Sequence, residues 1–434
     1  MLRHPLGRWV EPAQAWAALL ADEPHSFWLD SGQNAGVSYL GAGSRTITGA
    51  GVFDALRADL ATRRMADDTG PGFSLGWVGW LGYGLRAVSL GTPATAPSRY
   101  PDAALMFADR ALAFDHTTRE VTLLALGTAW EGELAAWRSA TVAALDVDRR
   151  LPVHVPADAH AAWAVADDRY LQLVAECQAA IHAGDAYQLC LTNEASVDVR
   201  PDPFAAYLAL REASPAHHGG LLRFGDVSLL SSSPEQFLSV TPDGTVESKP
   251  IKGTRARGAT AAADAALRAE LLASDKETAE NLMIVDLMRN DIGRVSALGS
   301  VTVPSLFAVE SYPQVHQLVS TVRGRLAPGL DAVDAVVACF PAGSMTGAPK
   351  RNATLILERL ERRPRGIYAG AFGYFGLDGR VDLAMVIRSI VLDAEGATVG
   401  AGGGITALSV PVEELAEVKL KAAALLAVLT TRAP

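Results

Sequence analysis

The chain has 434 residues, of which 49% are hydrophobic and 20% charged, and its formal net charge is −10 at pH 7. This composition supports one large core or roughly two to three domains, and the acidic balance argues against nucleic-acid binding, which needs a basic face. No apolar run reaches the length of about eighteen residues that a membrane span needs, and residues 1–5 lack a signal core, so we expect a soluble, cytoplasmic protein.

The N-terminal part is predicted to consist largely of short strands. Residues 27–31 and 76–83 combine bulky aromatic rings with small residues, as buried strands and their turns often do. The segment 151–156 contains two prolines and resembles a linker. We therefore place a boundary near residues 145–165, between an N-terminal part, 1–150, and a C-terminal part, 160–434.

The C-terminal part alternates predicted helices and strands. Apolar residues at helical spacing predict a helix over 168–182, and a strand is expected over 188–199. A hairpin is expected over 221–240, turning at Gly225-Asp226. The other predicted elements are a hairpin of 368–377 and 381–392 around Asp378-Gly379, and long helices over 261–289, 347–362 and 411–429.

The three cysteines, Cys177, Cys190 and Cys339, are scattered along the chain. Their spacing matches neither a disulfide framework nor a metal-binding motif. We predict that all three are buried and behave as small hydrophobic side chains.

Glutamates on two predicted helices form a candidate metal site. Glu414, Glu417 and Lys421 are spaced by three and four residues, so the helix 411–429 carries them on one face. Glu280 lies at the edge of a strongly apolar helix, where an unpaired carboxylate is unfavourable. Such an oxygen-rich set suits Mg²⁺. The alternative for the 411–429 face is a surface ladder of charges.

Two basic residues lie in apolar surroundings. Lys252 follows Pro250-Ile251, and burial would favour the neutral, nucleophilic form of its amine. The alternative is a solvated turn. Arg388 ends the apolar segment 383–387 and needs a carboxylate partner, either from a ligand or from an Asp or Glu of the chain.

Two backbone segments are candidates for anion binding. Gly402-Gly403-Gly404 allows close approach of a carboxylate, and successive N–H groups can form an anion nest, although a tight turn is the alternative. Thr346 and Gly347 lie at the predicted start of the helix 347–362, whose free N–H groups and dipole favour an anion.

Six segments, in this order, resemble one enzyme family. They are GDAYQ at 184–188, SSPEQF at 232–237, PIKGT at 250–254, ENLMIVDLMRNDIGR at 280–294, FPAGSMTGAPK at 340–350 and AGGGI at 401–405. Over about residues 165–430 the chain resembles the chorismate-utilising enzymes, which include component I of anthranilate synthase and of aminodeoxychorismate synthase and the isochorismate and salicylate synthases. The resemblance implies chorismate as the ligand and an α/β (α+β) fold, in which two β-sheets pack face to face with helices outside and the site between them.

The resemblance assigns further roles within the site. It implies that Glu280, Glu417 and Glu414 hold Mg²⁺, which bridges to the ring carboxylate of chorismate. It pairs Tyr368 and Arg388 with the enolpyruvyl carboxylate. The other substrate-binding residues that it implies are Gln188, Thr254, Thr346, Gly347, Gly402, Gly403, Gly404 and Lys421.

Two positions indicate the branch of the family. Isochorismate and salicylate synthases carry lysine in place of Gln188, and a neutral amide cannot activate water. Anthranilate synthases typically carry alanine in place of Lys252, whereas lysine marks the aminodeoxychorismate synthases. The implied reaction is a double displacement, in which neutral Lys252 attacks C2 as the C4 hydroxyl leaves and ammonia then adds at C4. Glu235 is the implied acid and base, with a salt-bridged turn carboxylate as its alternative.

The chain departs from the family pattern at some positions. Gln317 stands where the family usually has histidine, and His316 is displaced by one residue. Because that histidine serves aromatisation in anthranilate synthases, its loss fits a product that keeps the enolpyruvyl group. Leu408 stands where aspartate is common. Residues 27–31 resemble part of the tryptophan site of anthranilate synthases, with a simple core strand as the alternative.

The sequence contains no Gly-x-Cys-x-Gly elbow of a glutaminase. The resemblance therefore implies component I of an aminodeoxychorismate synthase, which takes ammonia from a separate glutamine amidotransferase and serves 4-aminobenzoate and folate biosynthesis. One alternative is component I of an anthranilate synthase. A second is a non-catalytic, tryptophan-binding subunit of the same fold.

Overall fold

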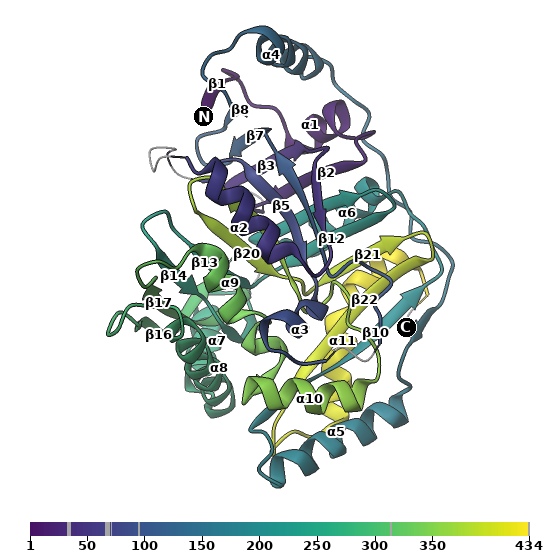
Figure 1. The fold of residues 1–434 in the computed structure, drawn as a ribbon. Coiled ribbons are helices and arrows are strands. Elements are labelled where there is room, and N and C mark those ends of the chain that lie inside the picture. The colour runs from purple at the N-terminus through teal and green to yellow at the C-terminus, as the bar shows by residue number, and fades with distance from the viewer. Residues whose placement is uncertain (33–35, 66–69, 71, 94–95, 313–314, 433–434) are drawn as a thin grey trace.

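Two large β-sheets pack against each other, and helices cover both outer faces (Figure 1). The computed structural model describes residues 1–32, 36–65, 70, 72–93, 96–312 and 315–432. Neighbouring strands within each sheet run antiparallel. The predicted fold of two packed sheets with helices outside is therefore confirmed.

The first sheet contains 12 strands. In spatial order they are β1 (Leu2–Pro5), β8 (Glu120–Ala125), β7 (Arg110–Asp115), β3 (Val37–Ala42), β2 (His25–Asp30), β11 (His218–Phe224), β12 (Val227–Ser233), β21 (Ser389–Asp393), β22 (Gly396–Ile405), β10 (Gln188–Val197) and β18 (Gly347–Ala348), while β9 (Ala161–Trp163) also pairs with β10.

The second sheet contains 10 strands. In spatial order they are β15 (Ile251–Ala256), β17 (Val315–Arg325), β14 (Thr245–Ser248), β13 (Gln236–Val240), β20 (Val381–Met385), β19 (Ala371–Gly376), β5 (Gly76–Leu81), β6 (Ala103–Ala108) and β4 (Thr46–Thr48), while β16 (Thr302–Ser311) also pairs with β17.

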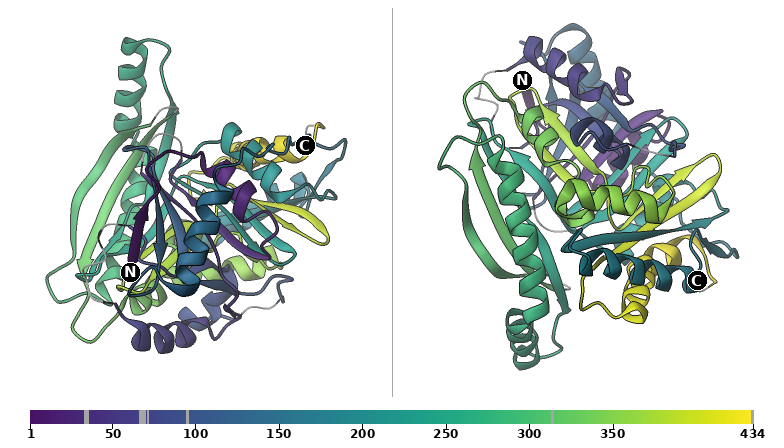
Figure 2. Two further views of the ribbon diagram at one scale, coloured as in Figure 1. Left: turned by 90° about the horizontal axis from the view of Figure 1, so that it is seen from above. Right: turned by 60° about the horizontal axis from the view of Figure 1, so that its bottom comes forward.

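Helices form the two outer layers (Figure 2). Those that pack on the first sheet or beside it are α1 (Pro12–Leu19), α4 (Gly132–Ala144), α5 (Asp167–His182), α6 (Pro203–Ala213), α10 (Lys350–Glu361) and α11 (Pro411–Leu429). Those that pack on the second sheet or beside it are α2 (Val52–Arg63), α7 (Ala261–Ala273), α8 (Asp275–Gly293) and α9 (Ala332–Cys339). The short elements are α3 (Arg86–Ser89), η1 (Tyr83–Leu85) and η2 (Gly343–Met345).

Three hydrophobic clusters hold these layers together. The first lies between the first sheet and its helices, and the second lies between the second sheet and its helices. The third lies between the sheets. Strand β5 shows how the sequence produces this arrangement, because Trp77 belongs to the second cluster whereas Val78 and Trp80 belong to the inter-sheet cluster. A strand that is buried on both faces in this way carries apolar side chains at successive positions.

Most predicted elements are confirmed, with corrected boundaries. The helices α5 and α11, the strand β10 and the turns at Gly225-Asp226 and Asp378-Gly379 lie where the sequence predicts them. The predicted helix 261–289 is two helices, because Ser274 ends α7 and caps α8 by accepting a hydrogen bond from Glu277 N. All three cysteines are buried, as predicted.

Two further predictions about helices and strands are wrong. The helix predicted from 347 begins at Lys350, because Gly347 and Ala348 pair with β10 and Pro349 precedes the helix. The strand predicted over 381–392 is broken, since β20 belongs to the second sheet and β21 to the first. Arg388, at φ +50°, lies between them.

Strands from both predicted parts of the chain share both sheets. Strand β2 pairs with β11, and β5 pairs with β19. Residues 151–156 form neither helix nor strand. The division into parts 1–150 and 160–434 stays a prediction.

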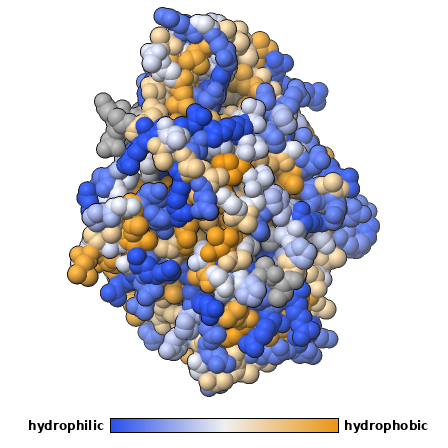
Figure 3. All heavy atoms as spheres, in the orientation of Figure 1, coloured by the Kyte–Doolittle hydropathy of each residue, from blue (hydrophilic) through white to orange (hydrophobic). Residues whose placement is uncertain are grey.

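Across the ranges described above, no helix is both long and apolar enough to cross a membrane. On the face drawn in Figure 3, hydrophobic side chains occur in small groups between hydrophilic ones. Large apolar side chains that are well exposed include Leu298, Leu408 and Val153.

Candidate active site

Two chain crossovers between the sheets position a carboxylate and a guanidinium. Glu235 lies between β12 of the first sheet and β13 of the second, and Arg388 lies between β20 and β21. The crossovers are joined by backbone hydrogen bonds, in which Met385 N donates to Glu235 O at 3.0 Å and Ser232 N donates to Arg388 O at 3.0 Å. Both functional residues are therefore fixed where the chain passes from one sheet to the other.

Lys252 lies where four elements converge. It belongs to β15 of the second sheet, and its Nζ is 3.8 Å from Glu280 Oε2 of α8. A Cβ added at Gly404 of β22 would lie 3.6 Å from Lys252 Nζ and would overlap Gln188 Nε2 of β10. The lysine, the amide and the glycine strand therefore lie close together, in a cluster of side chains that we call the chamber.

The expected effect of burial on Lys252 is outweighed in this structure. Burial disfavours the ammonium form, but the Glu280 carboxylate, assisted by Glu235 and Glu417, raises the pKa of Lys252 above its ordinary value. The prediction that burial makes the amine neutral is therefore wrong for this arrangement. The lysine must lose a proton before it can act as a nucleophile.

Glu235 has the properties of a proton-transfer group. Burial raises its pKa to about 7, although the charges of Lys252 and Lys421 and a hydrogen bond from Ser344 act in the opposite direction. A carboxyl group with this pKa exists in both protonation states near neutral pH, which suits general acid and base catalysis.

The three predicted metal ligands lie in the same region, but each carboxylate already contacts another side chain of the protein. Glu417 Oε1 is 2.6 Å from Lys421 Nζ, Glu414 Oε1 accepts a hydrogen bond from Ser409 at 2.7 Å, and Glu280 faces Lys252. No group of three or more His, Cys, Asp or Glu side chains among the described residues converges closely enough to hold a metal ion.

The protonation of these carboxylates follows their surroundings. Burial raises the pKa values of Glu280 and Glu414. Burial acts in the same direction on Glu417, but Lys421 outweighs it and lowers the pKa of that carboxyl. The charge of Lys276 acts on all three carboxylates, and the charge of Glu417 acts on the other two. This donor set has the oxygen chemistry that Mg²⁺ prefers.

The glycine run forms regular strand rather than an anion nest. Gly402, Gly403 and Gly404 belong to β22 and pair with Thr192, Leu191 and Cys190 of β10. None of the three has a positive φ. The predicted nest is therefore wrong. The glycines leave room for side chains instead, because a Cβ at Gly403 would lie 2.9 Å from Glu414 Oε2, and Gly402 O accepts a hydrogen bond from Lys421 Nζ at 2.8 Å.

Arg388 lacks an ion-pair partner within the described part of the chain. Burial lowers its pKa, whereas Tyr368 and Glu417 act in the opposite direction, so both groups lie near it. Tyr368 precedes β19 and packs against Gly400. Tyr368 is therefore not on a strand, contrary to the prediction, but it does lie close to Arg388. A partly buried guanidinium without a counter-ion suits a carboxylate ligand.

The other predicted substrate residues differ in their surroundings. Gln188 is buried, and its Oε1 has no hydrogen-bond partner among the residues described. Thr346 and Gly347 lie between η2 and α10 rather than at a helix start, and Thr346 Oγ1 donates to Ala342 O at 3.1 Å. Thr254 is exposed on β15, two residues after Lys252. The structure therefore gives Thr254 the weakest connection to the chamber.

The departures from the family pattern have clear structural positions. His316 is buried and hydrogen-bonds to Ser311 Oγ at 2.8 Å and to Asp264 Oδ1 at 3.0 Å, so it is held on the α7 side of β17. Gln317, its neighbour, is buried on the opposite face of the strand. Leu408 is 91% exposed, after the glycine strand.

Three residues near the site were missed in the sequence. Ser344 hydrogen-bonds to Glu235. Cys190 is two residues after Gln188 on β10, so the two side chains share a face. Its thiol also acts to raise the pKa of Lys252. Lys276 precedes Glu280 by one helical turn, and this spacing is the one signal that the sequence offered.

In the element that resembles part of a tryptophan site, the carboxylate of Asp30 is bonded to other side chains of the chain. Asp30, at the end of β2, forms an ion pair with Arg211 and accepts hydrogen bonds from Tyr207 at 3.1 Å and from Ser38 at 2.9 Å. Its carboxylate therefore serves a structural network, as in the core-strand alternative.

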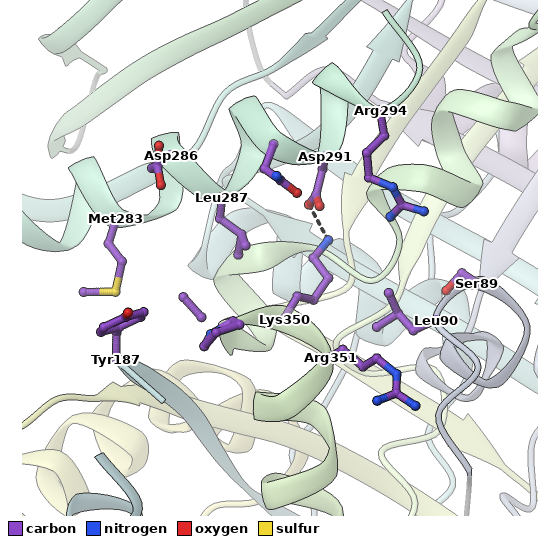
Figure 4. Close-up of a pocket in the computed structure, with 13 residues that line it drawn as sticks. Ser89, Leu90, Tyr187, Met283, Asp286, Leu287, Asp291, Arg294, Lys350 and Arg351 are labelled. Carbon is purple, nitrogen blue, oxygen red and sulfur yellow. Dashed lines mark ion pairs between the residues drawn. The ribbon is translucent and has the colours of Figure 1, made fainter. Parts of the chain in front are cut away.

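A cavity of about 550 Å³ lies between α8 and the start of α10 (Figure 4). Its apolar wall includes Tyr187, Met283 and Leu287. The buried ion pair of Lys350 and Asp291, 2.5 Å apart, joins the two helices there. Lys350 Nζ also donates to the carbonyls of Cys339 and Pro341, at 2.7 Å each, so the charge of Lys350 is used in folding.

The chain matches the profile of the chorismate binding enzymes over residues 9–427, so it belongs to that family. It is 46% identical, over 96% of its length, to the aminodeoxychorismate synthase of Streptomyces pristinaespiralis, and covers 63% of that protein. It is 35% identical, over 98% of its length, to anthranilate synthase component 1 of Mycolicibacterium smegmatis, and covers 90% of it.

A solved structure shows the same architecture. Anthranilate synthase component I from Streptococcus pneumoniae superposes with a TM-score of 0.77 at 29% identity, with 98% of this chain and 99% of that chain covered. The fold is therefore the one that the resemblance implies. The chain spans less than two thirds of the length of the Streptomyces pristinaespiralis protein, 63%, and of a second relative, the aminodeoxychorismate synthase of Streptomyces griseus, 64%.

Proposed function

We propose that the chain is the chorismate-processing component of an aminodeoxychorismate synthase, an enzyme that converts chorismate and ammonia to 4-amino-4-deoxychorismate for 4-aminobenzoate and folate biosynthesis. The observation that carries this proposal is the position of Lys252, whose Nζ lies in the chamber 3.8 Å from Glu280. The names of the Streptomyces relatives support the same activity.

In this proposal Lys252 first releases its ammonium proton to solvent. Its neutral amine then attacks C2 of chorismate, the ring double bond shifts, and the C4 hydroxyl leaves as water. Glu235, with its pKa of about 7, supplies the proton to that hydroxyl. Ammonia then forms a bond to C4, the double bond shifts back, and the bond from C2 to Lys252 breaks. Glu235 takes up the proton that ammonia loses, which returns the site to its starting state.

Arg388 and Tyr368 would hold the enolpyruvyl carboxylate, because the guanidinium forms no ion pair with the described side chains and Glu417, which lies near it, is paired with Lys421. Glu280, Glu414 and Glu417 would hold Mg²⁺, which supplies Lewis-acid polarisation of the ring carboxylate when bound. Bringing the three carboxylates onto a cation would require Glu280 and Glu417 to part from their lysines.

The ammonia is proposed to come from a separate glutamine amidotransferase, and the cytoplasm is the proposed location. The 434 residues contain no Gly-x-Cys-x-Gly elbow, and the proposal therefore assigns glutamine hydrolysis to a glutaminase outside this sequence. Free ammonium would substitute for the partner at high concentration.

The proposal is tested by product analysis. Purified protein is incubated with chorismate, Mg²⁺ and ammonium, and the products are separated by mass beside the Lys252→Ala variant and a matched Lys249→Ala control. We expect 4-amino-4-deoxychorismate from the wild type and the control, and at least a roughly 1,000-fold loss in Lys252→Ala, as is typical when a nucleophile is removed.

Component I of an anthranilate synthase is the second candidate, because the Mycolicibacterium relative with that name aligns over nearly the whole chain. It predicts anthranilate and pyruvate in the same assay. Formation of these products at a rate unaffected by Lys252→Ala would replace the first proposal with the second.

A further inference from the structure

A cavity of about 240 Å³ lies apart from the candidate active site. It is enclosed by η1 and the start of α3 on one side and by the end of α10 and residues 363–366 on the other. None of the predicted active-site residues lines it. Its volume is below the roughly 300 Å³ at which sites for drug-sized ligands begin, so it suits a small organic molecule.

Two arginines that line the cavity are already neutralised. Arg86 forms an ion pair with Glu358. Arg365 donates from Nε and Nη2 to Glu361, at 2.8 Å each. Tyr83 lies between these guanidiniums, with its ring centroid 5.0 Å from Arg86 Cζ and 4.4 Å from Arg365 Cζ. These ion pairs leave no net charge on that part of the wall.

A third arginine, Arg363, has N–H donors without acceptors, although the carboxylates of Glu194 and Glu361 lie near enough to interact with its charge. Arg363 Nη2 donates to Thr192 Oγ1 at 2.8 Å, but its Nε and Nη1 are buried and lack acceptors within the described ranges. Tyr83 Oη and Arg86 Nε are buried without partners in the same set. Buried donors of this kind are normally satisfied by protein, water, an ion or a ligand, because an unmet buried donor loses its hydrogen bonds to water without replacement.

The wall also carries one acid without a basic partner. Asp102 has no ion pair among the described side chains, and burial raises its pKa while the charge of Arg86 opposes that shift. Gly84 makes room for this carboxylate, since a Cβ there would overlap Asp102 Oδ1. The cavity therefore presents one cation, Arg363, and one anion, Asp102, neither of which forms an ion pair with the described side chains.

We propose that this cavity binds a free amino acid, whose carboxylate pairs with Arg363 and whose ammonium group pairs with Asp102. A ligand with both charges satisfies both groups, whereas a simple anion leaves the half-buried Asp102 unpaired and a simple cation leaves Arg363 unpaired. Arg365 donates to the carbonyls of Cys190 at 2.8 Å and Met345 at 2.6 Å, so the cavity shares a wall with the candidate active site.

The intact protein is titrated with each standard amino acid, and binding is measured by calorimetry and by the shift in melting temperature. We expect at least one amino acid to bind and to raise the melting temperature. Acetate and methylammonium, which each carry a single charge, should bind about tenfold more weakly or less, since one charged pair is worth at least about 1.4 kcal/mol.

Substitutions separate this site from others. Arg363→Gln and Asp102→Asn should each weaken the binding about tenfold or more, whereas Arg359→Gln, on the exposed side of α10, should leave it unchanged. If Arg363→Gln does not fold, Arg363→Lys serves in its place, with a smaller loss expected. The proposal is overturned if no amino acid binds, if binding persists in both charge variants, or if acetate binds as tightly as the amino acid. Because the readout is binding rather than turnover, its failure would not bear on the proposed synthase activity.

Discussion

At the scale of single residues, opposite charges and burial compete at each functional group. Lys252 stays an ammonium because Glu280 outweighs burial, whereas Glu235 is driven toward its neutral form because burial outweighs Lys252 and Lys421. The chamber thus holds one group that must lose a proton and one that titrates near neutrality. Two neighbouring groups with shifts of this kind are typical of catalytic sites.

The raised pKa of Glu235 predicts a pH-dependent loss of stability. Its pKa is about 7 in the folded protein and 4.5 ordinarily, so the folded state binds the proton more tightly. Stability from this group is full below about pH 4.5 and falls as the pH rises to about 7. Glu235→Gln cannot ionise, so relative to the wild type it should gain about 2–3 kcal/mol in free energy of unfolding between about pH 5 and pH 8, at 1.36 kcal/mol per unit.

Denaturant unfolding at both pH values measures this difference. The exposed Glu212→Gln variant is the control and should show no such gain. A wild type and a Glu235→Gln protein that respond equally to pH would show that Glu235 is not buried as described.

The uncompensated guanidinium of Arg388 predicts a binding defect. Arg388→Gln removes a charge-assisted interaction worth about 1.5–3 kcal/mol, so the KM for chorismate should rise by roughly 10- to 100-fold. Steady-state kinetics with Arg359→Gln as the exposed control measures the effect. An unchanged KM would mean that the enolpyruvyl carboxylate is held elsewhere.

At the scale of elements, the site depends on strands that approach closely. Gly404 of β22 lies against Gln188 of β10 and near Lys252 of β15. Its φ is not positive, so alanine fits the backbone but not the space in front of it. Glycine is needed at this position because the side chain of Gln188, from the neighbouring strand, occupies the space where a Cβ would lie.

Gly404→Ala should therefore separate activity from folding. Its methyl group displaces the flexible end of Gln188, so we expect a melting temperature close to that of the wild type and a fall in kcat/KM of about tenfold or more. Gly293→Ala, where an added Cβ meets nothing within 4 Å, is the matched control. Equal kcat/KM values for the two variants would contradict the described contact.

The ion pair between α8 and α10 predicts a stability effect. Lys350 and Asp291 are both buried, so Lys350→Met leaves an unpaired carboxylate and should lower the free energy of unfolding by about 3–5 kcal/mol. The double variant Lys350→Met/Asp291→Leu should recover most of this loss. Denaturant unfolding of the three proteins gives the comparison, and a double variant less stable than Lys350→Met would refute it.

The sequence predicted elements with strong local signals and missed features set by tertiary contacts. Helix α11 has its predicted bounds because Pro411 and the apolar spacing mark it locally. The break at Ser274 and the redirection of the chain at Arg388 depend on packing between elements. Likewise, the motifs indicated Lys252, Gln188 and Glu280 as members of one site. The direction of the Lys252 pKa shift, however, follows from distances that no sequence pattern specifies.

At the scale of the whole molecule, neither sheet is complete without both parts of the chain. The inter-sheet cluster combines Phe27, Trp80 and Met106 from the first part with Leu229 and Phe372 from the second. Strands β11 and β19 would become edges without β2 and β5. An exposed apolar edge of this kind promotes aggregation.

Residues 160–434 expressed alone should therefore fail to fold cooperatively. We expect no sharp thermal transition and a loss of near-ultraviolet circular dichroism, whereas co-expression with residues 1–150 should restore both. A cooperative transition in the isolated fragment would establish it as an independent domain.

The central claim is that Lys252 is a nucleophile. It is tested most directly by measuring the intact mass of the protein after a reaction with chorismate and limiting ammonium has been quenched with acid during turnover. We predict a fraction of the protein carrying chorismate less one water, located on the peptide that contains Lys252 and absent from Lys252→Ala. Unmodified protein throughout turnover, with Lys252→Ala forming product at the wild-type rate, would contradict the account.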